Sequence, residues 1–384
     1  MTKIFITIPW FLPAFRAGGP VQSIANLVKE FHEGVEYFIF CGDTDLNGAA
    51  LENITTGKWV PFNEYTQVWY AAPQKISERL VRQIEKIKPD ILYINGMFSW
   101  HFNMVPILFC KAPVKILSTR GMLHAGALSQ KKWKKKIYLQ AFKLLEYHHK
   151  VSFHATDEEE YKYISNYFGK AANIFTAGNF PNKTGTLPFP LKEVGSLSMA
   201  SIALVSPMKN ILLVLQALEK SEANIRYDIY GPIKDEAYWD LCKQTIKTLP
   251  ENIRVHYHKE IEPHKTKEAL ASIHVFILPS KSENFGHAIY EALSAGRPVI
   301  TSNNTPWNYL SESNAGINIH IDDKIKAINE LSESIAFFAS MDNTEIQKWH
   351  KGAVAYAEKA IDVEITKEAY AKMFLNYPSL TEEK

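Results

Sequence analysis

The chain has 384 residues, more than one hydrophobic core usually serves, so two domains are expected. Its hydrophobic content of 46% and charged content of 22% are ordinary for a soluble globular protein, and its formal charge of +2 means that electrostatic binding of any partner must come from a local patch. Three widely spaced cysteines, Cys41, Cys110 and Cys242, suit a reducing compartment and exclude a cysteine zinc pattern.

The N-terminal stretch is expected to form a buried strand. The sequence MTKIFITIPWFLPAF has one lysine and no small-residue cleavage site, unlike a signal peptide. The longest apolar stretch, 103–117, is interrupted by prolines and lysines and is too short to span a bilayer. A cytoplasmic protein is therefore expected, with a peripheral location on the inner face of the plasma membrane left open.

The first half of the chain alternates short β-branched or aromatic runs with amphipathic stretches, a pattern typical of parallel α/β architecture. The predicted strands are 3–8, 36–41, 90–95, 114–119 and 150–156. The predicted helices are 20–32, 74–88, 129–149 and 157–168. These segments predict one doubly wound, Rossmann-like domain over residues 1–180.

A second domain is predicted after a break in this alternation. The stretch AGNFPNKTGTLPFPLKEVGS is rich in proline and glycine and lacks periodicity, so a linker is placed at 181–198. The predicted strands beyond it are 201–205, 226–231, 253–257, 274–279, 297–302 and 315–319. The predicted helices are 208–220, 235–248, 287–295, 323–340, 344–359 and 363–376. They form a second Rossmann-like domain over 199–360 and a C-terminal helix within 361–384. Such domains bind ligands outside the carboxyl ends of their strands, and two facing domains create a cleft.

Two loops of the first half are candidate ligand sites. Gly18 and Gly19 lie between the first strand and first helix, where free backbone amides can hold phosphate or sugar oxygens. The alternative is an ordinary turn with glycines for geometry. Arg120 and His124 follow the strand at 114–119, again at its carboxyl end. For His124 the alternative is a surface histidine.

A basic run follows that loop. Its lysines crowd the first turns of a helix, where the helix dipole disfavours cations: Lys131, Lys132, Lys134, Lys135 and Lys136. Trp133 begins an apolar stripe that repeats every four residues through Ile137, Ala141 and Leu145. This pattern favours contact with anionic lipid headgroups, while a solvated face remains the alternative. Nucleic-acid binding is not expected, because the run carries an apolar stripe and no recognised motif.

The second half offers a lysine and two glutamates at corresponding places. Lys209 lies at the start of a helix after a strand, where it can meet a diphosphate, unless it is only a solvated lysine. In the stretch SENFGHAIYEALSAGRPVI, Glu283 lies in the loop after strand 274–279 and Glu291 on the polar side of the following helix. Helical spacing alone does not separate Glu291 from a solvated residue. Its position at the ligand-binding edge favours carboxylates that accept hydrogen bonds from sugar or ribose hydroxyls.

These residues resemble a known family. Glu283 and Glu291 have seven residues between them, with FG after the first and EALSAGRPVI running on from the second. This arrangement resembles the Glu-seven-Glu motif of retaining glycosyltransferases of family 4, which have the GT-B fold. The segments FLPAFRAGGPVQSIANLV, STRGML, HATDEEEY and the Pro-Met-Lys-Asn stretch extend the resemblance over most of the chain. It implies two facing Rossmann-like domains and a C-terminal helix that crosses back to the N-terminal domain.

The resemblance also implies roles for individual residues. Glu291 would bind the ribose of the donor nucleotide, Lys209 its diphosphate, and Glu283 the donor sugar. The backbone beside Glu283 would assist, at Asn284, Phe285, Gly286 and His287. In the first domain, Gly18 and Gly19 would approach the donor phosphates or the acceptor, Arg120 would contact the donor, and His124 would lie near the transferred sugar. Glu283 and His124 are thus the catalytic candidates.

One feature departs from the family pattern. An arginine commonly precedes the lysine that matches Lys209, but Leu204 or Val205 stands there. Either Arg120, Arg297 or another cation replaces it, or donor binding is weak; an inactive protein is the remaining alternative.

The predicted function is transfer of a sugar from a nucleotide diphosphate sugar, a UDP-sugar by expectation, to a hydroxyl of a glycan or lipid-linked glycan in surface polysaccharide synthesis, with retained configuration. The family typically needs no metal, so no cofactor is expected, and the pair Asp43 and Asp45 is discounted as a metal site. The alternatives are a sugar-nucleotide epimerase of the same fold and a non-catalytic sugar-nucleotide-binding subunit.

Overall fold

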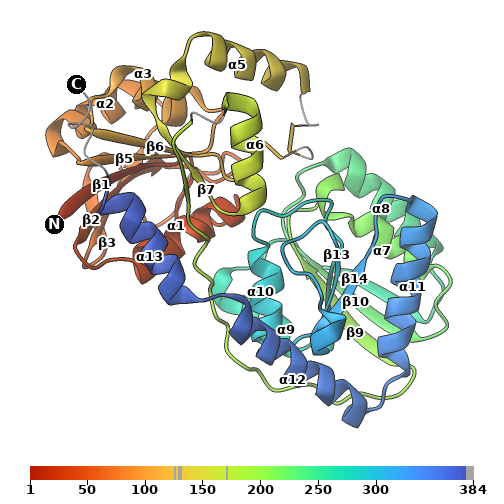
Figure 1. Cartoon of the computed structure of the whole chain (residues 1–384). Helices are drawn as coiled ribbons and strands as arrows, with labels where there is room; N and C mark the ends of the chain where they lie inside the picture. The colour runs from red at the N-terminus through yellow and green to blue at the C-terminus, as the bar shows by residue number, and fades with distance from the viewer. Residues whose placement is uncertain (125–126, 129–131, 170–171, 378–384) are drawn as a thin grey trace. The chain divides into compact units, whose positions relative to one another are not determined.

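The computed structural model describes residues 1–124, 127–128, 132–169 and 172–377. The chain forms two compact units: unit 1 comprises Met1–Phe180 and Asp362–Lys384, and unit 2 comprises Pro181–Ile361. Each is a twisted sheet of mainly parallel strands with helices on both faces (Figure 1). The α/β class predicted from the alternation of short apolar runs is confirmed.

The sheet of unit 1, within the described residues, has eight strands in the order β3-β4-β2-β1-β5-β6-β7-β8. The strands are β1 (Thr2–Thr7), β2 (Val35–Gly42), β3 (Trp59–Asn63), β4 (Thr66–Ala71), β5 (Ile91–Asn95), β6 (Val114–Ser118), β7 (Ser152–Ala155) and β8 (Ile174–Thr176). Only the β3–β4 hairpin is antiparallel among these described pairings. The first sheet thus presents the carboxyl ends of β1, β5 and β6 at one edge.

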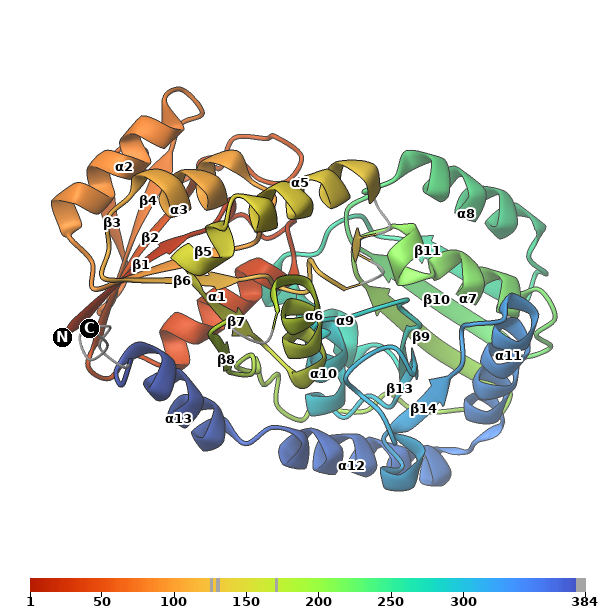
Figure 2. The same ribbon diagram turned by 45° about the horizontal axis from the view of Figure 1, so that its top comes forward.

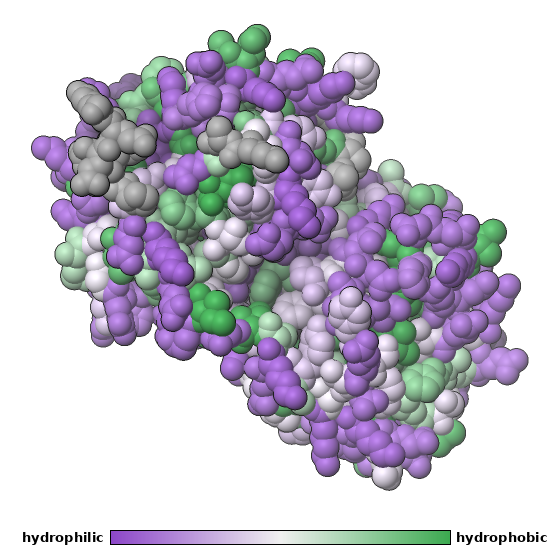
Figure 3. All heavy atoms as spheres, viewed as in Figure 1, coloured by the Kyte–Doolittle hydropathy of each residue, from purple (hydrophilic) through white to green (hydrophobic). Residues whose placement is uncertain are grey.

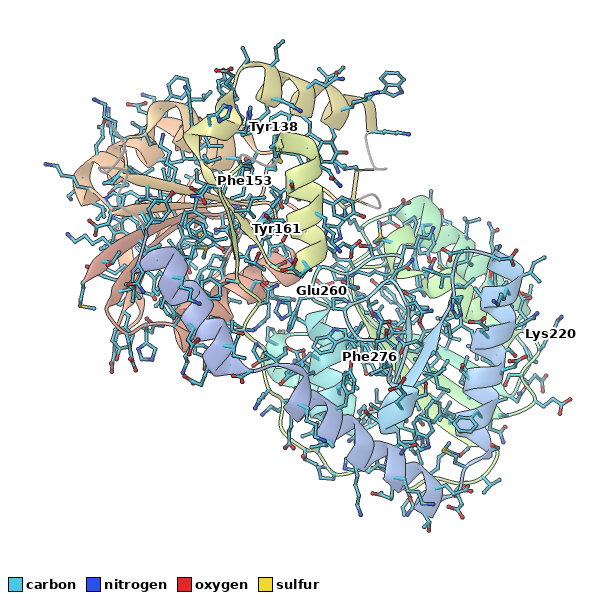
Figure 4. The ribbon with its side chains drawn as sticks, in the orientation of Figure 1. Tyr138, Phe153, Tyr161, Lys220, Glu260 and Phe276 are labelled. Carbon is cyan, nitrogen blue, oxygen red and sulfur yellow. The ribbon has the colours of Figure 1, made fainter. Side chains whose placement is uncertain are left out.

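The two faces of this sheet carry separate cores. Alternate residues of β1 point to opposite faces, with Phe5 in one cluster and Ile4 and Ile6 in the other. The cluster around Phe5 is covered by α2 (Ile76–Ile87), α3 (Val105–Phe109), α5 (Lys132–Leu144) and α6 (Glu158–Phe168). Phe153 of β7 lies in this layer (Figure 4). The opposite face is covered by α1 (Gly19–Glu30) and α13 (Val363–Phe374).

Unit 2 has a six-stranded parallel sheet, again among described residues, in the order β11-β10-β9-β12-β13-β14. The strands are β9 (Ser196–Ile202), β10 (Asn224–Tyr230), β11 (Ile253–Tyr257), β12 (Val275–Leu278), β13 (Val299–Ser302) and β14 (Gly316–Ile319). One face packs on α7 (Ile211–Leu218), α8 (Glu236–Thr248) and α11 (Lys324–Ser340). The other packs on α9 (Thr266–Ala271), α10 (His287–Ser294) and α12 (Asn343–Ala360), and Phe276 of β12 lies in this second core (Figures 2 and 4).

Short helical turns complete the two units. They are η1 (Trp100–Met104, a π-helix) and η2 (Tyr147–Lys150) in unit 1, and η3 (Pro207–Lys209), η4 (Pro263–Lys265) and η5 (Ser311–Ser313) in unit 2. Several longer helices begin after an aspartate whose carboxylate accepts a backbone amide of the first turn: Asp157, Asp235, Asp323, Asp342 and Asp362. Such caps satisfy amides that have no partner inside the helix, which fixes where each helix starts.

The C-terminal helix belongs to unit 1 although it follows unit 2 along the chain. Tyr370, Met373 and Phe374 of α13 are at most 2% exposed and join the core beside α1. The chain therefore passes between the units twice, after Phe180 and after Ile361.

Some elements differ from the predicted ones. The β3–β4 hairpin and β8 lie in stretches where no strand was predicted. The strand expected at 201–205 lies at Ser196–Ile202, so that its first three residues fall in the predicted linker, because it begins with the weakly apolar run SLSMAS. The helix predicted at 129–149 is described over Lys132–Leu144. Residues 129–131 lie outside the described residues, and the helix ends at Leu144, before the η2 turn.

No helix in the described part of the chain is long and apolar enough to cross a membrane. Cys41, Cys110 and Cys242 are buried free thiols.

Candidate functional site

The candidate site of unit 2 lies where β9 and β12 end. These strands are parallel neighbours, so the loops that leave their carboxyl ends meet. Lys209 ends the 3₁₀ turn after β9, and Glu283 lies in the loop between β12 and α10. Two hydrogen bonds join the loops: Asn210 Nδ2 donates to the Pro279 carbonyl at 3.0 Å, and the Lys281 amide donates to the Met208 carbonyl at 2.8 Å.

Lys209 and Glu283 form an ion pair at the centre of this junction. Glu283 Oε1 accepts a hydrogen bond from Lys209 Nζ and another from Ser280 Oγ at 2.6 Å. The side chains are 19% and 11% exposed, so a cation and a carboxylate are held together at the rim of the sheet with some access to solvent. The structure thus brings together the two residues predicted to contact the diphosphate and the sugar.

The start of α10 is fixed by aromatic packing. Gly286 caps the helix with φ of 76°, and a Cβ there would lie 3.1 Å from Trp307 Nε1. Glycine is therefore required both by the backbone conformation and by the close approach of the indole. Trp307 Nε1 donates to the Phe285 carbonyl at 2.5 Å, and the Phe285 ring lies 5.3 Å from Trp307.

Two other predicted residues belong to the same segment. Asn284 lies in the loop just before Phe285. His287 is the first residue of α10, and its ring centroid is 4.6 Å from that of Phe285. All four predicted backbone positions thus lie at the N-terminal end of α10.

Glu291 lies one turn further along α10 and is partly buried. Its Oε1 accepts a hydrogen bond from Asn182 Nδ2 at 2.9 Å. Burial raises the pKa of the Glu291 carboxyl above its ordinary value, and the hydrogen bond from Asn182 opposes that rise. A solvated residue on a helix surface would show neither feature. Asn182 was missed from sequence, because nothing in the linker pattern indicates which α10 side chain it contacts.

The glycines of unit 1 lie in the loop from β1 to α1. Gly18 is the residue before α1 and has φ of 70°. A Cβ at Gly18 would meet nothing within 4 Å, so glycine is favoured there by backbone conformation. The first turn of α1 has no acidic residue, and Gly19 is exposed. This helix end therefore keeps the features expected for holding an anion.

Arg120 has a structural position that does not support the predicted donor contact. It is 7% exposed, and its three guanidinium nitrogens donate to Asn95 Oδ1 at 2.9 Å, Asn179 Oδ1 at 2.9 Å and Tyr93 Oη at 2.8 Å. These bonds tie the end of β5 to the last residues of unit 1 before the boundary. The guanidinium is thus committed within the unit.

Arg297 cannot replace the arginine absent before Lys209 either. It is 0% exposed, with Nε donating to the Leu270 carbonyl at 2.6 Å and Nη2 to the Pro188 carbonyl at 2.5 Å. Burial lowers the pKa of the Arg297 guanidinium to about 10. This side chain holds the segment before β9 against the sheet.

Two lysines lie beside the position of the absent arginine. The Lys234 amide donates to the Val205 carbonyl at 3.0 Å, and the Lys281 amide bonds to Met208. Both side chains are exposed, and neither ammonium group has a hydrogen-bond or ion-pair partner among the described residues. These are the cations that flank the β9–α7 loop in the structure.

His124 is buried rather than on the surface. It is 5% exposed, and its ring centroid is 5.0 Å from that of Tyr163 on α6. The turn that leads to it is held by Glu160, a fully buried carboxylate of α6 that sequence reasoning missed. Glu160 accepts hydrogen bonds from Thr119 Oγ1, the Gly121 amide at 2.6 Å and the Thr156 amide at 2.8 Å. Burial alone would raise the pKa of Glu160, but these hydrogen bonds outweigh it and hold the pKa below its ordinary value.

The basic helix α5 presents its apolar stripe outward. Trp133 is 77% exposed and Ile137 63%, whereas Leu139 and Phe142 are buried on the opposite side. Three lysines of the run are exposed and Lys135 is partly so: Lys132, Lys134, Lys136 and Lys135. In Figure 3 hydrophobic side chains stand among hydrophilic ones along the upper edge, over α5. Lys131 lies outside the described residues.

No group of three or more histidine, cysteine, aspartate or glutamate side chains is placed to hold a metal ion in the described part of the chain. Asp45 instead pairs with Arg16, at 3.8 Å between Nη1 and Oδ2.

Residues 189–351 match the family model described as glycosyl transferases group 1, which covers the Lys209, Glu283 and Glu291 segments. Unit 2 therefore contains a glycosyltransferase domain. This assigns the protein to the transferase enzymes. A search of curated protein sequences gave no match.

Solved structures similar to the chain share its fold at low sequence identity. Sucrose-phosphate synthase from Thermosynechococcus elongatus has a TM-score of 0.70 and 14% identity, covering 98% of this chain and 99% of that one. Anabaena HepE in complex with UDP and glucose has a TM-score of 0.68 and 14% identity, covering 98% and 100%. WaaG, a glycosyltransferase involved in lipopolysaccharide biosynthesis, has a TM-score of 0.64 and 12% identity, covering 97% and 99%. The GT-B fold predicted from the sequence is confirmed.

Proposed function

We propose that the protein is a retaining glycosyltransferase of family 4 that moves a sugar from a UDP-sugar to a hydroxyl of a glycan or lipid-linked glycan. The observation that carries this proposal is the Lys209–Glu283 pair with Glu291 at the carboxyl edge of the second sheet. This pair joins a phosphate-binding charge to a hydroxyl-binding carboxylate inside the glycosyltransferase domain. HepE, similar in fold, is described in complex with UDP-glucose, which supports the choice of UDP.

In the proposed donor complex, Glu291 accepts hydrogen bonds from the ribose hydroxyls and Glu283 from a hydroxyl of the sugar. Lys209 and the amides at the start of α10 meet the diphosphate. Lys209 is already paired with Glu283 before the donor arrives. On binding, the diphosphate replaces Glu283 as the partner of Lys209, and the sugar hydroxyl replaces Lys209 as the partner of Glu283. The two charges are therefore held at the site in advance, and the donor must separate them as it binds.

The chemical step in this proposal breaks the bond between the anomeric carbon and the diphosphate oxygen. Lys209 and helix amides stabilise the negative charge that grows on the leaving diphosphate. The acceptor oxygen forms the new bond to the anomeric carbon from the same face and passes its proton to the leaving diphosphate oxygen, so the configuration is retained. We assign no enzyme nucleophile.

The second positive charge near the diphosphate is proposed to come from Lys281. It lies on the same loop as Glu283, and its amide bonds to the residue before Lys209. Its exposed ammonium group can turn toward a phosphate without breaking any interaction among the described residues.

Unit 1 is proposed to bind the acceptor, with α5 resting on an anionic membrane surface at the inner face of the plasma membrane. The exposed Trp133 and Ile137 among lysines support this, since apolar and basic groups together favour the interface of anionic lipids. A lipid-linked acceptor in surface polysaccharide synthesis would be reached from there.

The test is incubation of the protein with UDP-, GDP- and ADP-sugars and measurement of released nucleotide. Slow hydrolysis of a UDP-sugar, faster with an acceptor and unchanged in EDTA, is expected, and NMR of the product should show retained configuration. Formation of a new sugar nucleotide would instead identify an epimerase, and binding without turnover a non-catalytic subunit. Loss of activity in EDTA would contradict the absence of a metal requirement.

A further inference from the structure

The chain that enters unit 2 is fastened along the candidate nucleotide-binding helix. Asn182, the second residue of the unit, donates to Glu291 at 2.9 Å. The Thr184 amide donates to Ser294 Oγ at 3.1 Å, one turn further along α10. The Leu187 amide then donates to the Ala295 carbonyl at 3.3 Å. Segment 182–187 thus follows α10 from its middle to its end.

The hydrogen bond from Asn182 differs from the other two because its acceptor is the side chain of Glu291, a residue proposed to bind the nucleotide. A carboxylate only accepts hydrogen bonds, so the amide nitrogen of Asn182 must face Glu291. Among described residues, Asn182 provides the one hydrogen bond that the Glu291 carboxylate accepts. It occupies Oε1 and leaves Oε2 available.

We propose that Asn182 is a donor-positioning residue, which fixes the Glu291 carboxylate through Oε1 so that Oε2 accepts the ribose hydroxyls of the donor nucleotide. This inference rests on the proposed function, in which Glu291 binds the ribose. A neutral amide suits this task, because it orients the carboxylate without competing as a cation for the diphosphate.

The burial of Glu291 gives a second reason for a hydrogen-bond donor beside its carboxylate. It raises the pKa of Glu291, and a protonated carboxyl would lose part of its capacity to accept hydrogen bonds. The hydrogen bond from Asn182 favours the ionised form. Asn182 therefore fixes the direction of the Glu291 carboxylate and also favours its ionised form.

A merely structural role for Asn182 makes different predictions, and Ser294 provides the matched control. Ser294→Ala removes the neighbouring tie between the segment and α10 and leaves the Glu291 carboxylate untouched. If the segment only needs to be fastened, Asn182→Ala and Ser294→Ala should have similar effects.

The experiment is calorimetric binding of UDP and of 2′,3′-dideoxy-UDP to the full chain and its variants, with thermal unfolding of each. Asn182→Ala is expected to weaken UDP binding by about 10-fold, the usual effect of losing a hydrogen bond to a charged group. Asn182→Asp should weaken it further through like charge. Dideoxy-UDP should bind wild type and Asn182→Ala with affinities within about 3-fold of each other, because it has no ribose hydroxyl that could donate a hydrogen bond to Glu291. Ser294→Ala should leave UDP binding unchanged.

A double-mutant cycle with Glu291→Gln separates the two proposals. Asn182→Ala should add no further loss once Glu291→Gln is present, since it acts through that carboxylate. Additive losses, equal losses with UDP and dideoxy-UDP, or unchanged UDP binding in Asn182→Ala would overturn the positioning role while leaving the proposed function intact. If wild type binds no UDP, or Glu291→Gln binds it normally, both fail.

Discussion

The ion pair of Lys209 with Glu283 gives the two residues separable roles. Glu283→Gln removes the carboxylate but releases the Lys209 ammonium, so UDP binding should stay within about 3-fold of wild type or tighten. Sugar transfer should fall by about 100-fold or more, because the sugar is no longer held. Lys209→Ala should instead weaken UDP binding by about 10- to 100-fold. Calorimetry with UDP and nucleotide-release assays check both. Equal effects of the two variants on UDP binding would contradict the assignment.

Comparing variants of Lys281 and Lys234 tests which lysine supplies the second positive charge near the diphosphate. Both are exposed lysines on loops that bond to the β9–α7 loop, but only Lys281 shares its loop with Glu283. Lys281→Ala is expected to raise the Kd for UDP by about 3- to 10-fold at low salt, and less at high salt, as befits an exposed charge. Lys234→Ala should change it little. If Lys234→Ala raises the Kd more than Lys281→Ala does, the second cation is Lys234, in the loop after β10.

Sequence alone predicted the position of two candidate site residues relative to a strand. Glu283 and Glu291 follow β12 at its carboxyl end, and this topology could be read from apolar runs. Arg120 follows β6 in the same way, whereas Arg297 lies just before β13, and both guanidinium groups turn inward. Side-chain direction depends on partners far along the chain, such as Asn179 and Pro188, and no local pattern carries it. Asn182 was missed for the same reason.

At the scale of elements, α5 is the helix whose surface is unusual. Lys132, Lys134 and Lys136 are exposed beside an outward apolar stripe, whereas Lys135 donates to the Ala127 carbonyl at 2.6 Å and should be left in place. Replacing those three lysines by glutamine should weaken binding to phosphatidylglycerol vesicles, measured by flotation, on the order of 100-fold, at about 1 kcal/mol per lysine. The stripe alone should support little binding to neutral vesicles.

The control for this variant is a triple replacement on α12, at Lys348, Lys351 and Lys359, which are also exposed. It makes the same change in net charge without an exposed tryptophan nearby on the same turn. Equal loss of flotation in both triple variants, or none in the α5 variant, would rule out a membrane role for α5.

Element boundaries were predicted best where periodicity was strong. The helices α8, α11 and α12 lie within a residue or so of their predicted ends, because an aspartate cap fixes each start. β9 begins earlier than predicted, because SLSMAS has the composition of a linker and forms a strand only through its pairing with β10 and β12. The β3–β4 hairpin, in which Trp59 pairs with Trp69, was also missed.

At the scale of the whole molecule, each unit contains a buried histidine that must stay neutral. His154 of β7 is 0% exposed, and burial, assisted by the nearby Arg120 guanidinium, lowers its pKa to about 4. Its Nε2 lies 2.8 Å from the Ala177 carbonyl and its Nδ1 2.7 Å from Tyr93 Oη, a pattern that a neutral ring satisfies. In unit 2, burial lowers the pKa of His274 to about 4 as well.

These histidines should make both units acid-sensitive. In the unfolded chain a histidine titrates near its ordinary pKa of about 6.5, so below that pH the unfolded state binds a proton that the folded state does not. The stabilisation is therefore complete above about pH 6.5 and is lost as the pH falls toward about 4. His154→Gln should reduce the slope of the free energy of unfolding in this window by up to about 1.4 kcal/mol per pH unit. Urea denaturation at several pH values measures it. Phe153→Leu, on the same strand, should lower stability without changing the slope, so an unchanged slope in His154→Gln would show that His154 does not couple folding to protons.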